Sequence, residues 1–419
     1  MSILPLVSSK YKLLFSAITI ASFGGFLQAS AQKLAFPEAE GFGRFATGGR
    51  GGEVYHVTNL NDSGEGSFRD AVSQSNRTIV FDVTGVIKIT DKIKASPKIT
   101  VAGQTAPGQG IVVYGNGVSF ADSSIIRYIR FRGSINMPRG ACTVVADNCK
   151  DVIFDHVSIA WGRWDNLHIK NSHNITLQYC LIGESIDPQR FGALFENPTN
   201  ITVHHSLWID NSSRNPKAKA GIEYINNVIY NWGSNGFVGG HSGAVHTQDI
   251  INNYFIAGPS SSKSYMGLFS ATDRVYQRGN YLDANKDGKL NGRLLVDSDF
   301  VKKGPTLLKT SNYKPAVNID NAAAAYKKVL NEVGASLRRD AVDERLIGYL
   351  KSLGTKGQIF RNEADAGGQP NLPAGEKFAD SNNDGIPDKW DKKFNTSASN
   401  DENGYTRLEK YLNDIVKLK

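Results

Sequence analysis

The chain has 419 residues, of which 40% are hydrophobic and 21% charged, and these proportions exclude both wholesale disorder and an integral membrane bundle. The formal net charge of +8 favours polyanionic partners but does not identify the polyanion. The 42 glycines, set against 14 prolines and lacking a collagen period, indicate many tight turns, as a chain of short strands requires.

The first 31 residues have the layout of a secretory leader. Lys10 and Lys12 precede an apolar stretch over residues 13–27, which is followed by Ala29-Ser30-Ala31. A basic start, a short apolar run and an A-x-A site predict a cleaved signal peptide over residues 1–31. No other segment approaches membrane length, so we expect an exported protein without a membrane span.

The chain contains three cysteines, Cys142, Cys149 and Cys180. An odd count in an exported protein of this size indicates that disulfides are not its main support. Free thiols are the expected state, and a Cys142–Cys149 bridge stays open as an alternative.

A pattern of alternating apolar and polar residues, rich in β-branched side chains, recurs from about residue 120 to residue 285. Copies begin at Ser124, Val152, Ile175, Ile201 and Ile222. Their spacing of roughly 21–28 residues is typical of solenoids, and hairpin signals are too scarce for the alternative, an antiparallel sandwich. Short strands stacked at this period predict an all-β fold, a right-handed parallel β-helix forming one domain over residues 32–320. Recurrent Asn-Asn pairs, at 226–227 and 252–253, are expected at the corners of the coils.

The remaining quarter of the sequence has a different composition. Residues 321–365 are helical in character, and we expect them to pack on the outside of the solenoid. The stretch 366–375 is rich in glycine and proline and is interpreted as a linker.

Residues 376–419 form a small segment with an EF-hand-like or thrombospondin-type-3-like calcium loop. Asp380, Asn382, Asp384 and Asp388 place oxygen ligands at alternate positions, with a glycine at the sixth position for the sharp turn. The glutamate expected at the twelfth position is absent, because Asp391 stands there. A structural calcium ion bound by this loop is the resulting prediction.

Charged and aromatic residues fall at corresponding places in three successive coils. Because neighbouring strands lie about 4.8 Å apart, residues at matching positions become neighbours. We therefore expect one exposed groove in which cations bind the carboxylates of an acidic polymer and tryptophans stack on its sugars. The residues of these clusters are Asp155, His156, Trp161, Asp165, Glu184, Asp187, Arg190, Arg214 and Lys219.

Several stretches make the chain resemble the pectate lyase family, in particular its exported bacterial branch of parallel β-helix polysaccharide lyases. They are AFPEAEGFG (35–43), GGRGGEV (48–54), VIFDH (152–156), NSSRNP (211–216) and NNVIYNW (226–232), with a looser echo in VGASL (333–337) and RDAVD (339–343). The resemblance covers roughly residues 35–258. It implies calcium-assisted β-elimination of polygalacturonate, the backbone of pectin, in which cations stabilise an enolate-like intermediate.

The resemblance also implies roles for individual residues. Arg214 matches the catalytic arginine of the family, which accepts the proton, and Lys219 matches an arginine that binds the substrate carboxylate. Arg190 lies close to a position at which the family often has lysine, and Asp165 matches a position at which this branch of the family has an acidic residue. Together with His156 and Trp161, Lys219 and Arg190 are the expected substrate-binding residues.

The chain departs from the family where better-known members carry calcium-binding acids. Cys142, Trp164 and His168 stand at or near these positions. We therefore expect a Ca²⁺ site in the groove with fewer acidic ligands, in which Asp165 is a ligand and Glu184 and Asp187 replace the missing ones.

Other functions fit parts of the same pattern. A pectin lyase-like enzyme would act on methyl-esterified polymer without calcium, and a non-catalytic β-helix would only bind acidic glycans. A glycosidase is disfavoured because the strands carry no close aspartate pair. We expect a monomer that binds neither nucleic acid nor membrane.

Overall fold

The computed structural model describes residues 1–2, 32–394 and 404–417, and the chain divides into two compact units, Met1–Gln32 and Lys33–Lys419. The predicted signal peptide lies almost entirely outside the described residues. Within those residues, no helix combines the length and the apolar character needed to cross a membrane. The second unit, Lys33–Lys419, contains all the helices and strands that the structure describes.

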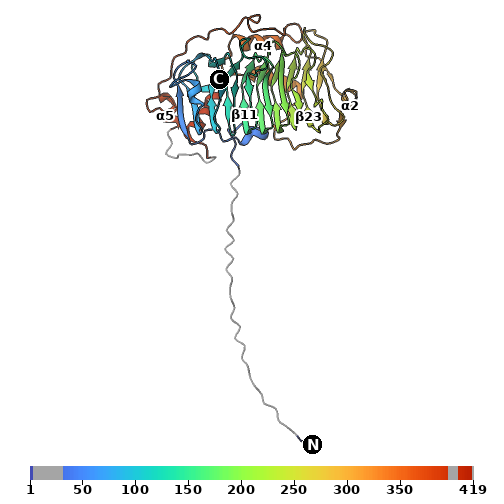
Figure 1. Ribbon diagram of the computed structural model, residues 1–419, viewed down its shortest axis with the longest axis horizontal. Coiled ribbons are helices and arrows are strands. Elements are labelled where there is room, and N and C mark those ends of the chain that lie inside the picture. Colours follow the sequence, from blue (N-terminus) through green and yellow to red (C-terminus); the bar gives the residue numbers. More distant parts are fainter. Residues whose placement is uncertain (3–31, 395–403, 418–419) are drawn as a thin grey trace. The chain divides into compact units, whose positions relative to one another are not determined.

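This unit is a parallel β-helix in which successive coils add strands to three sheets (Figure 1). Sheet A contains β1 (Glu53–Val57), β2 (Arg77–Phe81), β5 (Ile99–Ala102), β8 (Ile125–Arg127), β11 (Lys150–Asp155), β14 (His173–Gln178), β17 (Thr199–His204), β20 (Ile222–Ile225), β23 (Thr247–Ile251), β26 (Arg274–Arg278) and β29 (Thr306–Leu307). Sheet B contains β3 (Gly85–Lys88), β6 (Ile111–Tyr114), β9 (Arg130–Arg132), β12 (Ser158–Ala160), β15 (Leu181–Gly183), β18 (Leu207–Ile209), β21 (Val228–Tyr230), β24 (Tyr254–Ile256), β27 (Tyr281–Asp283) and β28 (Arg293–Leu294). Sheet C contains β4 (Ile93–Lys94), β7 (Val118–Ser119), β10 (Val144–Val145), β13 (Asp165–Lys170), β16 (Phe191–Glu196), β19 (Lys217–Lys219), β22 (Phe237–Val238) and β25 (Met266–Gly267). The parallel β-helix predicted from the sequence repeat is confirmed.

The core runs along the axis of the solenoid as columns of apolar side chains. In sheet A, Val152 pairs with Ile175, Ile175 with Ile201, and Ile201 with Ile222, and all four side chains are fully buried. Each coil thus covers the apolar residue of the coil before it, which is why the repeat is stable only when stacked. β-branched residues suit these positions because they pack well on a pleated surface.

The corner between sheets A and B turns through a residue with left-handed backbone angles. Asn226 and Asn252 adopt φ of 58° and 52° there, and the following Asn227 and Asn253 point inward and are fully buried. Asn253 Oδ1 accepts hydrogen bonds from the backbone N of Asn227 at 2.8 Å and from its Nδ2 at 3.1 Å. The predicted placement of the Asn-Asn pairs at coil corners is confirmed.

Helices lie outside or at the ends of the coils. The α-helices are α1 (Phe68–Ala71), α2 (Asp297–Val301), α3 (Ala322–Glu332), α4 (Ala341–Lys351), α5 (Asp388–Phe394) and α6 (Arg407–Asp414), and the 3-10 helices are η1 (Phe42–Phe45), η2 (Gly103–Thr105) and η3 (Ile415–Lys417). Residues 366–375, interpreted as a linker, contain neither helix nor strand.

Helices α3 and α4 pack on the outer face of sheet B. Val329 and Leu346 belong to an apolar cluster that also contains Leu207 and Val228 of that sheet. The start of α4 is fixed by buried ion pairs, because Arg132 Nη1 and Nη2 donate to the two carboxylate oxygens of Asp340 at 2.6 and 2.8 Å. The helical segment is therefore part of the fold around the solenoid.

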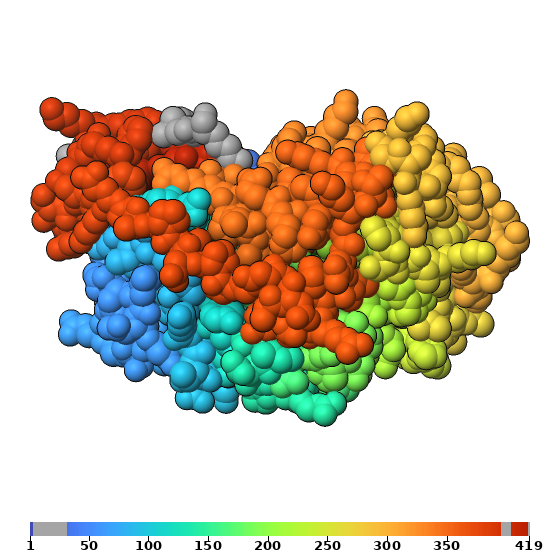
Figure 2. Space-filling model, turned by 90° about the horizontal axis from the view of Figure 1, so that it is seen from above, coloured from blue at the N-terminus to red at the C-terminus, as the bar shows by residue number. Residues whose placement is uncertain are grey.

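The two ends of the unit cover the outer face of sheet A. Gly43 lies so close to this sheet that an added Cβ would meet the carbonyl oxygen of Val152 at 2.3 Å, which explains a glycine in the AFPEAEGFG stretch. From the other end, α6 and its neighbours pack their apolar residues on Ala102. Figure 2 shows this C-terminal segment in red over the blue first coils. An ion pair of 2.6 Å between Arg50 Nε and Glu409 Oε1 joins the two ends.

Candidate active site

The outer face of sheet C carries rows of polar side chains. Strand β13 alternates, with Leu167 and Ile169 in the core and His168 and Lys170 directed outward. The pairing of β13 with β16 and of β16 with β19 extends the row of Lys170 through Glu196 to Lys219. Side chains from distant parts of the sequence therefore meet on one open surface.

Arg214 lies at one edge of this surface, in the turn that leads into β19. Its backbone is left-handed, with φ of 59°, and its guanidinium lies 4.0 Å from the ring centre of Phe191. Nη1 donates to both carboxylate oxygens of Asp165, at 3.2 and 3.1 Å. Asp165 is fully buried, whereas 17% of the Arg214 side chain is exposed, so one guanidinium is held from beneath and remains accessible from outside.

Burial raises the pKa of Asp165 to about 6, although the nearby charges of Arg214 and His168 oppose this shift. An acid with a raised pKa binds its proton more tightly in the folded state than in the unfolded state. Its contribution to stability is therefore present at low pH and is lost as the pH rises from about 4 to about 6. Relative to Asp165→Asn, we expect the free energy of unfolding of the unsubstituted protein to fall by about 2–3 kcal/mol between pH 4 and pH 7.

Urea titrations of both proteins at several pH values measure this difference. Parallel pH curves for the two proteins would contradict it.

Two lysines of β19 continue the positive surface from Arg214. The pKa of Lys217 is lowered by burial and by the charges of Arg214 and Lys219. Lys219 lies 3.7 Å from Glu196, which also pairs with Lys170 at 3.1 Å, and the hydrogen bond from Lys170 lowers the pKa of Glu196. The surface thus contains three cations from a six-residue stretch, and one of them is destabilised in its charged form.

A hollow of about 440 Å³ adjoins these residues on the same sheet. Trp164, with 37% of its surface exposed, lines it together with Cys142, Asp147 and His168. His168 Nδ1 lies 2.9 Å from Asp147 Oδ1. Of the two tryptophans in the first cluster, Trp164 is therefore the one available for stacking on a sugar, although Trp161 was the one named as a substrate-binding residue.

Trp161 and Glu184, which the sequence analysis placed in the groove, lie elsewhere. They follow β12 and β15 of sheet B, and both are fully buried. Trp161 Nε1 donates to Glu184 Oε2 at 3.2 Å, and the guanidinium of Arg345 from α4 donates to both Glu184 oxygens. These contacts hold α4 against the solenoid and leave neither side chain on the sheet C face.

His156 also lies away from this face, at the corner between sheets A and B. Its ring stacks between Tyr128 and Tyr179, with ring centres 4.5 and 5.0 Å away, and its Nδ1 lies 2.7 Å from Asp155 Oδ1.

Arg190 and Asp187 do lie beside the turn of Arg214. Their turn precedes β16 as that of Arg214 precedes β19, and Ser212 N donates to Arg190 O at 2.6 Å. Arg190 Nε and Asp187 Oδ1 are 3.2 Å apart, and the two side chains are 35% and 39% exposed. The structure therefore gathers Arg214, Asp165, Lys219, Arg190 and Asp187.

The C-terminal loop turns through Asp380, Asn382 and Asp384. Asp380 Oδ2 accepts from Gly385 N at 2.9 Å, and Asp384 Oδ1 accepts from Ile386 N at 2.9 Å. Both oxygens of Asp388 accept from Ser381. Across all the residues that the structure describes, no three His, Cys, Asp or Glu side chains gather as metal ligands.

Comparison with known proteins places this site in a family. No family model matches the chain. A protein of Aspergillus fumigatus named "Probable pectate lyase C" is 42% identical over 412 residues, which cover 96% of this chain and 98% of the relative. A protein of Emericella nidulans with the same name is 42% identical over 395 residues, covering 91% and 93%. The chain belongs to the pectate lyase family.

Solved structures agree with this pectate lyase assignment at the level of the fold. A Bacillus subtilis pectate lyase mutant covers 74% of this chain and 100% of its own, with a TM-score of 0.57 and 13% identity. A structure described as a pectate lyase bound to hexasaccharide has a TM-score of 0.54 and 14% identity, and the match covers 74% of this chain and 100% of the other. The three cysteines of this pectate lyase are free.

Proposed function

We propose that this pectate lyase cleaves polygalacturonate by β-elimination at the outer face of sheet C. The observation that carries the proposal is the exposed guanidinium of Arg214, held by the buried Asp165 and followed by Lys217 and Lys219 on the same face. An open row of cations suits a polymer that carries a carboxylate on every sugar.

The chemical difficulty of the reaction is the removal of the C5 proton next to a carboxylate that is already negative. Breaking the C5–H bond leaves an electron pair that forms the C4=C5 double bond and expels the C4 oxygen, which takes up a proton. Negative charge grows on the carboxylate during this step, so Lys219 and Lys217 stabilise it through fixed positive charge. Arg214 is the proposed proton acceptor.

A second acceptor is favoured by one observation. Arginine is not readily deprotonated in proteins, and the negative Asp165 beside Arg214 stabilises the charged guanidinium. Lys217 has a lowered pKa because it is partly buried between two other cations. If Lys217 accepts the proton, Arg214 orients and neutralises the sugar carboxylate instead. In both cases the rate rises with pH as the acceptor loses its proton.

Substitution of Lys219 by alanine is expected to raise KM for polygalacturonate roughly tenfold with a small change in kcat, because it removes a charge that binds the substrate carboxylate. Steady-state kinetics at fixed ionic strength measure the effect. Lys150→Ala is the control, since Lys150 is an exposed lysine of sheet A. An unchanged KM in Lys219→Ala would remove this residue from the binding surface.

Calcium assistance, which the family resemblance implies, requires converging oxygen ligands. The described acids at the sheet C face each contact a basic side chain: Asp147 contacts His168, Asp165 contacts Arg214, Asp187 contacts Arg190, and Glu196 contacts Lys170. Glu184 is paired with Arg345. These residues do not fit a calcium cage built from protein ligands alone, and none of the steps above depends on one.

The decisive assay follows the absorbance of the unsaturated product on polygalacturonate and on methyl-esterified pectin, each with added calcium and with chelator. Faster elimination on polygalacturonate supports a pectate lyase. A preference for the esterified polymer supports a pectin lyase-like enzyme, and no product on either supports a binding protein. Loss of activity in chelator at an unchanged melting temperature would show that calcium acts in the enzyme–substrate complex and not only in the C-terminal loop.

Export also belongs to this proposal and is supported by the leader sequence, and the protein is proposed to act as a monomer. The calcium loop at residues 380–388 is proposed as structural, because its side-chain oxygens already organise the turn. Signal-peptide cleavage, sedimentation and the calcium dependence of thermal unfolding test these three points.

A further inference from the structure

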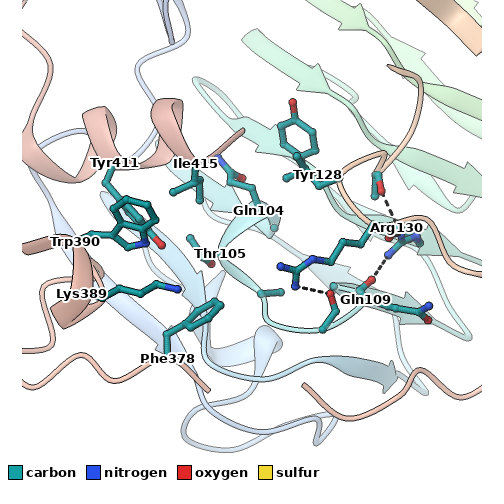
Figure 3. A pocket seen from close by; sticks show the side chains of 17 residues that line it. Gln104, Thr105, Gln109, Tyr128, Arg130, Phe378, Lys389, Trp390, Tyr411 and Ile415 are labelled. Carbon is teal, nitrogen blue, oxygen red and sulfur yellow. Dashed lines mark hydrogen bonds between the residues drawn. The ribbon is translucent and has the colours of Figure 1, made fainter. Parts of the chain in front are cut away.

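A second cavity, of about 470 Å³, lies at the corner between sheets A and B, away from the sheet C face (Figure 3). Its volume is within the range of about 300–1,000 Å³ that is usual for small-ligand sites. Three separate parts of the chain form its walls: the turn around η2, the loop between α3 and α4, and the C-terminal helices. In the figure, Lys389, Trp390 and Phe378 lie on one side of the cavity, and Gln109 and Arg130 lie on the other.

The charges that line the cavity are positive. Arg130 is paired with Asp343 at 3.0 Å, so its charge is compensated. Lys389 and Arg338 form no ion pair with any described residue: Lys389 Nζ lies 4.1 Å from the ring centre of Phe378, and Arg338 Nη1 donates to the carbonyl oxygen of Gly108 at 2.7 Å. No aspartate or glutamate is among the lining residues. The cavity therefore offers uncompensated positive charge to an anion.

The same walls carry groups suited to a hydroxylated ring. Trp390 and Phe378 present aromatic surface, on which the C–H faces of a sugar stack. Gln104 Oε1 is buried and accepts no hydrogen bond from the described residues. A buried acceptor without a donor costs free energy, and a ligand hydroxyl that donated to it would remove this cost.

We propose that this cavity is an ancillary binding site for an acidic oligosaccharide, in which Lys389 and Arg338 bind a uronate carboxylate and Trp390 or Phe378 supports a sugar ring. A ligand with only charge would leave the aromatic walls and Gln104 unused, and a neutral sugar would leave both cations uncompensated. Because η2 joins sheet A to sheet B, a short sugar bound here does not occupy the sheet C face. The site keeps a chain of polymer, or a released fragment, on the enzyme.

Calorimetric titration with trigalacturonate tests this inference in the full chain carrying Arg214→Ala and Lys217→Ala, which removes both proposed proton acceptors and so prevents cleavage during the measurement. We expect two binding events, of which one is weakened roughly tenfold or lost when Lys389→Ala and Arg338→Ala are added. Lys392→Ala is the matched control, an exposed lysine of the same helix that does not line the cavity. Neutral galactotriose is expected not to bind at this site.

Two results would overturn the inference: the same stoichiometry and affinity for trigalacturonate with and without the two added substitutions, or equal binding of galactotriose at the cavity. In the protein that retains Arg214 and Lys217, the Lys389→Ala and Arg338→Ala pair is expected to leave kcat on short oligogalacturonates unchanged. This activity readout separates the ancillary site from the proposed function, because absence of elimination in the unsubstituted protein would refute only the latter.

Discussion

Replacement of Arg214 by lysine is expected to lower kcat on polygalacturonate by roughly 10²–10⁴-fold, the range usual for loss of a group that transfers a proton or is fixed at the reacting centre. Lysine keeps a positive charge near the buried Asp165 but loses the planar group that contacts both carboxylate oxygens and lies over Phe191. Product absorbance at saturating substrate measures the effect, and the melting temperature shows whether the fold is retained.

Arg163→Lys is a suitable control for this substitution. Arg163 is also partly exposed near the sheet C face, but its guanidinium donates only to the backbone carbonyl oxygens of Met137 and Asp187 and pairs with no carboxylate of the site. Activity in Arg214→Lys close to that of the control would show that only charge is needed at this position. It would then shift the role of proton acceptor to Lys217, whose alanine variant is expected to show the larger loss.

Replacement of Arg132 by methionine is expected to lower the free energy of unfolding by about 3–5 kcal/mol. Arg132 is fully buried and binds Asp340 and Asp343 of the α4 region, with Nη2 at 2.9 Å from Asp343 Oδ1. Burial alone would raise the pKa of Asp340, but the charge and hydrogen bonds of Arg132 lower it below its ordinary value. Methionine has a similar volume but no charge, so the buried carboxylates of Asp340 and Asp343 lose the positive charge that Arg132 provides.

Arg293→Met provides the contrast in urea unfolding. The Arg293–Asp299 pair has equally good geometry, with both contacts at 2.8 Å, but 55% of the arginine side chain is exposed. Exposed pairs contribute about 0–1 kcal/mol, so a loss below 1 kcal/mol is expected. Similar losses in the two variants would show that the buried cluster does not hold α4 to the solenoid.

The solenoid was predictable from the sequence because the apolar residues that stabilise it recur once in every coil. Val152, Ile175 and Ile201 recur at the spacing of one coil, and each is buried by the next. Arg214 and Lys219 were named from the family resemblance and not from a strand pattern, because Arg214 lies in the turn before β19 and only Lys219 belongs to the strand.

The errors of placement at the site arise at the turns. Trp161 and Trp164 are three residues apart, yet one is buried under α4 and the other is exposed on sheet C, because the chain bends between them. A pattern of spacing does not tell on which side of a bend a side chain lies. The contacts of Arg132 with Asp340 join residues 208 positions apart. In the sequence, the only signal at Asp340 was the loose resemblance of residues 339–343 to the family.

The cover that the C-terminal helices provide for sheet A affects the order in which the protein reaches its native state. The residues that shield Ala102 and pair with Arg50 lie about 300 or more positions later in the sequence than the coils they cover. Contacts of such long sequence separation are slow to form, and exposed apolar surface in the meantime favours aggregation. The native contacts of the first coils therefore cannot be completed coil by coil, because their cover comes from residues as far away in the sequence as Glu409 is from Arg50.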